Sequence, residues 1–392
     1  MNPSLQGSYQ YYRVESYRSN IAPQNWRPEL LNSNLLPTVE RSLHYLQASK
    51  MRGTIAIEEA VIDPAGVEVH SFAQFQSLMQ PGSNAASGLS DHERRLLDIH
   101  GERLTSMDKH GVEYMLLSLT SPGAQGEAEP EKARSVARIA NDYLAGEVKK
   151  NPRRFGALAA LSMHSAQDAA DELRRAVKEL GMFGAMINDF QSKGGDAQEK
   201  MYFDSPEYDL FWATVQELDV PVYFHPRYAI KQDLEPGTKY GDRKHLLGAG
   251  VQFHLDLSWH LYAICSSGVF DRFPKVQIVA GHLGEGIPFN LWRASHWINK
   301  PFKRGARPMK HDYTYYWTHN VSITTSGDYN TRGLKFCMEE IGLERCLYAI
   351  DTPYDTIEEA QAWWKSIDLS EEQKEAVGRS NAIRLFKLPL EQ

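Results

Sequence analysis

The stretch Val220-Pro221-Val222-Tyr223-Phe224-His225-Pro226 decides the fold, because an unbroken apolar run ends abruptly at a histidine. Such a run is typical of a buried strand. Pro226 cannot continue the hydrogen-bond ladder of a sheet, so the strand has to end at His225 and hold the imidazole at its terminus.

Short apolar runs of this kind recur along the chain. They are predicted at 54–58, 113–118, 155–161, 185–188, 220–225, 276–280, 321–325 and 346–350. Amphipathic helical patterns lie between them, for example at 131–148, 166–180, 205–218 and 255–270, and a final helix is predicted at about 370–385. Alternating strands and helices indicate parallel βαβ units, and eight repeats close a barrel. We therefore predict an α/β fold, a TIM-like (β/α)8 barrel.

The chain is longer than such a barrel requires, and the excess lies after the first, fourth, fifth and sixth strands. We expect these long irregular segments to lie over the C-terminal face of the barrel. An open doubly wound sheet is the alternative. It would need a glycine-rich phosphate turn after the first strand, where Ile57-Glu58-Glu59-Ala60 stands instead.

The first fifty residues differ from the rest. They are rich in Ser, Asn, Gln and Tyr, and only 38–46 has the pattern of a short amphipathic helix. A transit peptide is disfavoured by Glu15 and Glu29, because such peptides are poor in acidic residues. We predict an irregular extension over 1–50 and a barrel over 51–392.

The composition of the chain limits the classes of molecule that it is expected to bind. The 392 residues are 42% hydrophobic, with a net charge of -7 and a pI near 6.1, so nothing favours nucleic acid or an anionic membrane. Cys265, Cys337 and Cys346 lack metal-type spacing, which fits a reducing compartment. No apolar run is long enough to span a membrane. We expect a soluble cytoplasmic protein that acts on a small molecule.

Three polar residues stand at predicted strand ends: Glu58, His225 and Asp351. Each has an ordinary explanation, namely a rim salt bridge for Glu58, a hydrogen-bonded buried imidazole for His225 and a helix N-cap for Asp351. Together they point to a shared cation, because carboxylates brought into a protein interior must be paired or bind a metal. Mostly oxygen ligands without a thiolate suit Mg²⁺ or Mn²⁺ at least as well as Zn²⁺. Open coordination positions would make the site catalytic.

The stretch Gly281-His282-Leu283-Gly284-Glu285 follows the sixth strand and is predicted to start a helix. A spacing of three would place Glu285 beside His282 on the first turn, where it fixes the histidine tautomer for acid, base or donor chemistry. A capping arrangement without catalysis is the alternative. Arg293, two turns further on, is the best placed cation for an anionic substrate group, unless it is simply an exposed helix arginine.

With these motifs the chain resembles the metal-dependent, nonoxidative aromatic decarboxylases of the amidohydrolase superfamily. This group contains 2,3-dihydroxybenzoate, γ-resorcylate and salicylate decarboxylases and is related to aminocarboxymuconate semialdehyde decarboxylase. The resemblance covers about 52–388. It rests on 56–60, 121–126, 159–164, 224–226, 270–274, 281–285, Thr324-Thr325-Ser326-Gly327 and Asp351-Thr352-Pro353-Tyr354.

The resemblance implies that Glu58, His225 and Asp351 hold one divalent ion, that Asp351 donates the proton, and that His282 and Glu285 assist. Arg293 matches an arginine that contacts substrate, in some members from the neighbouring subunit. Many relatives have a histidine where this chain has Ala60.

The implied reaction is loss of CO₂ from an ortho-hydroxybenzoate after protonation of the ring carbon, reversible at high bicarbonate. No organic cofactor is expected, and the resemblance implies a homodimer or homotetramer. Two other functions stay open. A hydrolase, lactonase or hydratase on the same barrel would use the ion to activate water, and a noncatalytic binding protein would lack stoichiometric metal.

Overall fold

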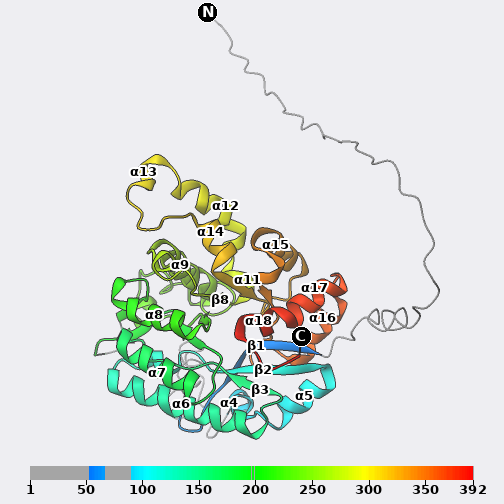
Figure 1. Cartoon of the computed structure of the whole chain (residues 1–392). Coiled ribbons are helices and arrows are strands. Elements are labelled where there is room, and N and C mark those ends of the chain that lie inside the picture. Colours follow the sequence, from blue (N-terminus) through cyan, green and yellow to red (C-terminus); the bar gives the residue numbers. More distant parts are fainter. Residues whose placement is uncertain (1–52, 67–89, 196, 198, 392) are drawn as a thin grey trace, which may run out of the picture. The chain divides into compact units, whose positions relative to one another are not determined.

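The computed structural model describes residues 53–66, 90–195, 197 and 199–391 (Figure 1). The predictions for 1–50, including the short helix at 38–46, lie outside these residues.

Within the described residues, eight parallel strands form two sheets. One sheet has the order β1-β2-β3 and the other β10-β9-β8-β7-β4. The strands are β1 (Thr54–Val61), β2 (Val112–Leu119), β3 (Phe155–Ala157), β4 (Ala185–Asn188), β7 (Val222–His225), β8 (Ile278–Ala280), β9 (Val321–Thr324) and β10 (Cys346–Leu347). All eight predicted strand positions are therefore occupied.

Backbone contacts join the two sheets into a barrel. On one side, Ala159 forms a single parallel bridge with Ala185. On the other side, the Ala60 amide donates to the Thr352 carbonyl oxygen at 2.8 Å and the Asp351 amide donates to the Glu58 carbonyl oxygen at 3.1 Å. The predicted (β/α)8 barrel is confirmed.

Five strands are shorter than predicted, and two of them, the third and the eighth, end three or more residues early. The third ends at Ala157 and the eighth at Leu347, instead of at 161 and 350. The residues beyond these points leave the regular ladder. The Ala349 amide, for example, donates to the Thr325 side-chain hydroxyl oxygen at 3.1 Å rather than to a backbone carbonyl.

The barrel core follows the two-residue period of the strands. Ile57, Tyr223 and Val279 belong to a cluster inside the barrel. Their strand neighbours Phe224 and Ala280 belong to a larger cluster that includes the buried faces of the surrounding helices. Each strand therefore packs on both of its faces, which explains its apolar sequence.

Helices cover the outside of the barrel (Figure 1). In chain order they are α4 (Asp91–Leu97), α5 (Glu102–His110), α6 (Pro130–Lys150), α7 (Ala166–Lys178), α8 (Asp209–Leu218), α9 (Gln252–Ser266), α10 (Val269–Arg272), α11 (His282–Glu285), α12 (Ile287–Ile298), α13 (Pro301–Arg304), α14 (Tyr313–His319), α15 (Thr331–Ile341), α16 (Ile357–Ser366), α17 (Glu371–Glu375) and α18 (Asn381–Phe386).

The predicted final helix is interrupted. A π-helical turn, η7 (Ala376–Ser380), separates α17 from α18. Within it, Gly378 lies so close to Trp364 that an added Cβ would be 2.9 Å from the indole ring. The buried Arg379 forms an ion pair with Glu113 at 2.6 Å. A periodicity argument cannot foresee such a turn, because it depends on these tertiary contacts.

The loops at the C-terminal face also carry structure. A hairpin of β5 (Gln191–Lys193) and β6 (Glu199–Met201) follows β4, and helices α12 to α14 fill much of the segment after β8, which was predicted to be irregular. None of the helices in the described part of the chain has the length and apolarity needed to cross a membrane.

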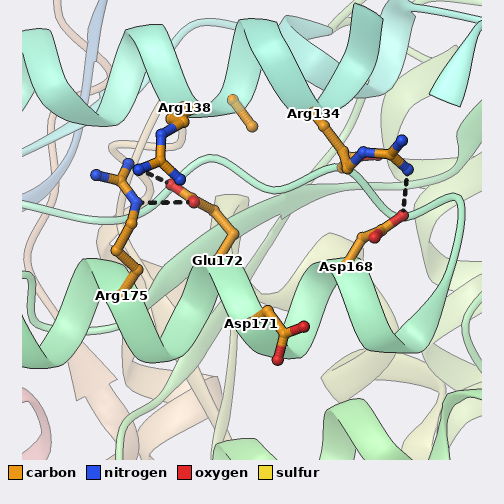
Figure 2. Close-up of a pocket in the computed structure, with 8 residues that line it drawn as sticks. Arg134, Arg138, Asp168, Asp171, Glu172 and Arg175 are labelled. Atoms are coloured by element: carbon orange, nitrogen blue, oxygen red, sulfur yellow. Dashed lines mark hydrogen bonds and ion pairs between the residues drawn. The ribbon is translucent and has the colours of Figure 1, made fainter. Parts of the chain in front are cut away.

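Charged residues line a cavity of about 200 Å³ between α6 and α7 on the outer layer (Figure 2). Arg134 forms an ion pair with Asp168 at 2.8 Å, and Arg175 donates two hydrogen bonds of 2.7 and 2.9 Å to Glu172. Two of the three arginines that line the cavity, Arg134 and Arg175, are therefore paired with carboxylates of the same cluster.

Candidate functional site

A bulge near the end of β1 sets the position of Glu58. Ala56 pairs with Met115 and Glu59 pairs with Leu117, so β1 has one residue more than β2 over this interval. Such an extra residue breaks the alternation of side chains and re-aims them. Ile57 and Glu58 consequently both contact groups inside the barrel.

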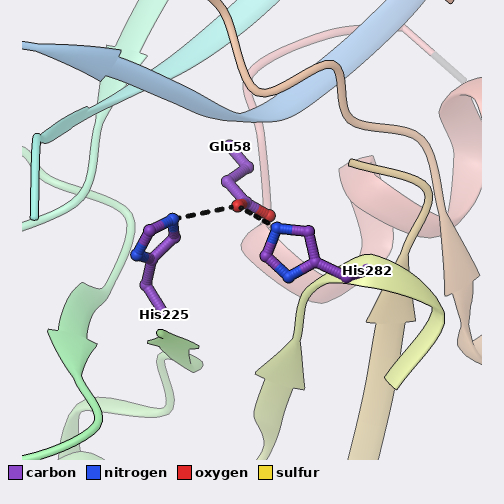
Figure 3. Close-up of side chains that lie close together, drawn as sticks. All are labelled: Glu58, His225 and His282. Carbon is purple, nitrogen blue, oxygen red and sulfur yellow. Dashed lines mark ion pairs between the residues drawn. The ribbon is translucent and has the colours of Figure 1, made fainter. Parts of the chain in front are cut away.

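The two carboxylate oxygens of Glu58, which is 2% exposed, have different surroundings. Oε2 accepts hydrogen bonds from the hydroxyl groups of Tyr223 and Ser326 and, at 3.4 Å, from Thr324. Oε1 is buried and makes no hydrogen bond with the described residues. It lies 3.3 Å from His225 Nε2 and 3.5 Å from His282 Nε2 (Figure 3).

His225 turns its Nε2 towards this point. Its Nδ1 lies 2.6 Å from the Pro226 carbonyl oxygen, which can only accept a hydrogen bond, so Nδ1 carries a hydrogen. Nε2 is therefore the nitrogen that faces Glu58 Oε1, and a cation placed between the two atoms would contact both.

His282 and Glu285 meet as predicted, but the predicted helical turn is wrong. The pair lies 2.7 Å apart between His282 Nδ1 and Glu285 Oε1. The backbone is left-handed, with φ of 51° at His282, 52° at Leu283, 77° at Gly284 and 55° at Glu285. This conformation is costly for residues with a Cβ and is found where the surrounding structure imposes it, often at active sites.

The charges of the cluster depend on one another. Burial alone would raise the pKa of Glu58, but His282 and His225 lower it. Burial opposes a charge on His282, but Glu285 and Glu58 outweigh it and raise the pKa of that imidazole to about 10. Burial and the nearby Glu58 raise the pKa of the Asp351 carboxyl well above its usual range.

Glu58, His225 and His282 are the residues whose ligand atoms come together, since one atom from each lies within 4.8 Å of the others. Asp351, and not His282, was predicted as the third ligand. Asp351 lies beside this group: its backbone amide donates a hydrogen bond to the Glu58 carbonyl oxygen, and its carboxylate interacts electrostatically with Glu58 and His282. It has a φ of 76°, another left-handed residue at the site.

The donor set fits a divalent cation. Two imidazole nitrogens and a buried carboxylate oxygen without a hydrogen bond converge on one point. Nitrogen and carboxylate oxygen are the ligands of catalytic zinc, manganese and related sites. Ala60 offers no ligand atom, and its methyl group packs with Ile62 and Leu96.

A cavity of about 460 Å³ opens beside this cluster. It is lined by Ala249, Gly250, Phe253, His254, His282, Glu285, Gly286, Gly327, Asp328, Asp351, Tyr354 and Asp355. Its size suits one small aromatic molecule. Because the catalytic candidates His282, Glu285 and Asp351 all line it, we interpret it as the substrate cavity.

Arg293 lies elsewhere. It is exposed on α12 and is not among the residues that line this cavity. Its contacts with the described residues of this chain do not support the predicted substrate role, which stays a prediction.

Sequence reasoning missed Asp328 and Asp355, which line the cavity from the loops after β9 and β10. The signal was present in part. Asp328 comes directly after Thr324-Thr325-Ser326-Gly327, and a polar residue soon after a barrel strand lies at the catalytic face.

The chain is similar to several known proteins. Residues 68–388 match the amidohydrolase family. The chain is 38% identical to a gamma-resorcylate decarboxylase of Rhizobium sp. over 341 residues, which cover 86% of this chain and 99% of the relative.

Two solved structures are similar over most of their length. A 2,6-dihydroxybenzoate decarboxylase complexed with 2,6-dihydroxybenzoate has a TM-score of 0.78 and 38% identity, covering 86% of this chain and 100% of the other. A dihydroxybenzoic acid decarboxylase from Polaromonas sp. with bound manganese and the inhibitor 2-nitroresorcinol has a TM-score of 0.77 and 37% identity, covering 87% of this chain and 98% of the other. The chain belongs to the amidohydrolase family, in the branch that includes the gamma-resorcylate decarboxylases.

Proposed function

We propose that this chain is a carboxy-lyase that removes CO₂, without oxidation, from an ortho-hydroxybenzoate. The observation that carries the proposal is the convergence of Glu58, His225 and His282 beside a cavity that Asp351 also lines. The relatives named above act on dihydroxybenzoates, and the cavity has the size for such a ring.

Glu58, His225 and Asp351 would hold the metal, with His282 beside it. Asp351 is proposed as the third ligand because its carboxylate interacts with Glu58 and lines the cavity, which leaves His282 to contact the substrate. A divalent ion held there supplies positive charge that lowers the pKa of the substrate phenol and neutralises its oxygens. Manganese in a relative favours Mn²⁺, with Mg²⁺ and Zn²⁺ as the other candidates.

The reaction requires a proton donor above the ring. The Asp351 carboxyl donates its proton to the ring carbon that bears the carboxylate, and that carbon becomes tetrahedral. The bond to the carboxylate then breaks, its electron pair returns to the ring, and CO₂ leaves as aromaticity is restored. Asp351 recovers a proton from water. The same steps in reverse carboxylate the phenol at high bicarbonate.

His282 stabilises the electron-rich substrate ring while the proton is added and CO₂ leaves. Its Nε2 faces the cluster while Glu285 holds Nδ1. A carboxylate partner keeps the imidazole oriented and charged, so it can donate a hydrogen bond to a substrate oxygen. Glu285 is therefore a positioning residue that acts through His282.

We further propose that the chain forms a homodimer or homotetramer in the cytoplasm. Phe289, Trp292 and Phe302, on α12 and α13, are 80%, 70% and 69% exposed, and an apolar surface of this kind is usually covered by a partner. Arg293 on the same helix would reach the substrate of the neighbouring subunit. Light scattering on the wild type and on Trp292→Asp tests this, since the variant should dissociate. The three free, buried cysteines fit a reducing compartment.

A CO₂-release screen over hydroxybenzoates, with metal analysis of the same preparation, tests the function. We expect CO₂ release that a chelator abolishes and one of the three ions restores. Turnover of an ester, lactone or enol acid without CO₂ would instead favour the hydrolase alternative. Full activity in metal-free protein would reject the site.

A further inference from the structure

Glu59, the neighbour of the proposed metal ligand Glu58, is completely buried and takes no direct part in the proposed chemistry. Both of its carboxylate oxygens accept hydrogen bonds from backbone amides. Oε1 accepts from the Ile350 amide at 3.0 Å, and Oε2 accepts from the Thr352 amide at 3.2 Å. These two residues flank Asp351 in the chain, so one side chain binds the backbone on both sides of the proposed proton donor.

The segment around Asp351 is held by side chains rather than by a regular strand ladder. Strand β10 ends at Leu347, and the Ala349 amide donates to the hydroxyl oxygen of Thr325. Asp351 itself is left-handed, with a φ of 76°. A residue with a Cβ keeps such a conformation only where its surroundings impose it. The hydrogen bonds of Glu59 to the two flanking amides are a direct means of imposing it.

Backbone hydrogen bonds attach the same segment to the end of β1. The Asp351 amide donates to the Glu58 carbonyl oxygen, and the Ala60 amide donates to the Thr352 carbonyl oxygen. Three consecutive residues of β1 therefore bind three consecutive residues of the loop after β10. Within this set of hydrogen bonds, those of Glu59 come from a side chain, so a substitution can remove them and leave the backbone bonds in place.

Arg103, a residue of α5 that is 4% exposed, supports the end of β1 from the outer layer. Its Nη2 donates to the Ala60 carbonyl oxygen at 2.6 Å, one residue beyond Glu59. Burial raises the pKa of the Glu59 carboxyl to about 8, against the opposing effects of Arg103 and of the Ile350 and Thr352 amides. Because carboxyl oxygens have lone pairs in either protonation state, the two amides find an acceptor whether Glu59 is ionised or neutral.

We propose that Glu59 is a positioning residue that acts through Asp351, because its two hydrogen bonds fix the backbone from which the Asp351 carboxyl enters the substrate cavity. The inference rests on the proposed function, in which Asp351 protonates the ring carbon. A general acid has to lie within hydrogen-bond reach of the atom that it protonates. A rotation of the backbone at Asp351 would move the carboxyl away from that carbon and slow the reaction without preventing substrate binding.

The first test measures kcat and KM for CO₂ release by the metal-saturated full chain. Glu59→Gln keeps one acceptor oxygen and places an NH₂ group opposite the other backbone amide, so kcat should fall by about tenfold. Glu59→Ala removes both acceptors and should lower kcat by about 10²-fold, with a much smaller change in KM. A kcat close to that of the wild type in Glu59→Ala would overturn the inference.

Asn141→Ala is the matched control. Asn141 of α6 is also completely buried, and its side chain binds the backbone amide and carbonyl of Ala160, which follows β3, at 2.8 and 2.9 Å. Ala160 is not among the described residues that line the substrate cavity. This variant should lose stability in denaturant unfolding, as Glu59→Ala does, but keep its kcat. A loss of kcat as large as that of Glu59→Ala would make the effect one of stability and overturn the inference.

Crystal structures provide a readout that does not require turnover. In Glu59→Ala we expect Asp351 to leave the left-handed region and its carboxyl to turn away from Glu58, whereas in Asn141→Ala the φ of Asp351 should stay near 76°. An unchanged Asp351 in Glu59→Ala would overturn the inference, and Glu59→Gln serves for the same comparison if Glu59→Ala does not fold. If no hydroxybenzoate released CO₂, the proposed function would fail, while the structures would still decide whether Glu59 positions Asp351.

Discussion

Two charged clusters of this molecule differ in how their charges are balanced. Between α6 and α7, each drawn ion pair joins an arginine to a carboxylate, as for Arg175 with Glu172 (Figure 2). At the barrel mouth, Glu58 faces two imidazoles (Figure 3). Asp351 interacts with Glu58 and His282, and no lysine or arginine is among the described residues that line the cavity. The ion pairs of the first cluster form within the protein, whereas the second cluster could hold a metal ion.

The comparison shows how structural charge differs from functional charge. A matched surface cluster adds little beyond local stability. A buried hydrogen-bond acceptor without a partner lowers the stability of the ligand-free protein. Such a destabilised group is typical of functional sites, where a bound ligand supplies the missing partner. Substitutions in the two clusters should therefore affect different properties.

The largest effect is expected for Asp351→Asn, which replaces the proposed proton donor with an amide. Loss of a general acid lowers kcat by about 10²-fold to 10⁴-fold, and loss of a metal contact would add to this. Steady-state CO₂ release measures the change. Near-normal turnover in this variant would remove Asp351 from the proton-donor role.

The second largest loss of activity is expected for Glu58→Gln, since a neutral amide cannot balance the charge of the metal ion. Weaker binding of the cation removes several kcal/mol of transition-state stabilisation, which corresponds to about 10³-fold in kcat/KM. Metal content by elemental analysis should fall in parallel. Glu172→Gln in the α6–α7 cluster is the control, and it should keep both its metal and its activity. A Glu58→Gln protein with stoichiometric metal would argue against this carboxylate as a ligand.

A smaller effect is expected for Glu285→Gln. The amide can still accept from His282 Nδ1 but no longer supports a positive charge on the ring. Loss of a partner behind a site residue costs about 10-fold to 100-fold. The variant should lower kcat more than it changes KM, and the metal content should remain. A change in metal content without a change in kcat would show that Glu285 supports metal binding and not the charge on His282.

The smallest effect on catalysis is expected for Arg175→Met in the matched cluster. It removes two hydrogen bonds to Glu172 and should lower the free energy of unfolding by about 1 to 2 kcal/mol. Denaturant unfolding measures this loss, and kcat/KM should be unchanged. A drop in kcat/KM as large as that of Glu285→Gln would remove the distinction between the clusters.

Much of the fold could be predicted from the sequence, because the eight apolar strands and their helices follow simple periods. The strand ends also predicted that Glu58, His225 and Asp351 lie at one end of the barrel, and the structure has Glu58 beside both of the others. Their roles stay a prediction. What could not be predicted arises from tertiary contacts. The extra residue of β1 that re-aims Glu58, the left-handed turn at His282 and the early end of β10 leave no trace in hydrophobic periodicity.

The third metal ligand could not be predicted from the sequence for the same reason. Sequence order placed His282 and Asp351 at the ends of the sixth and eighth predicted strands but could not give their distances from Glu58. The geometry brings His282 within the ligand group and leaves Asp351 beside it. Asp328 and Asp355 were missed because their place in the cavity depends on the paths of the loops after β9 and β10.

The most direct test of the central claim is an anomalous diffraction map of crystals grown with Mn²⁺. The account predicts one strong peak at the barrel mouth, about 2.0 to 2.3 Å from Glu58, His225 and Asp351. A map without a peak at that point, or with a peak that Glu58 and His225 do not contact, would contradict it.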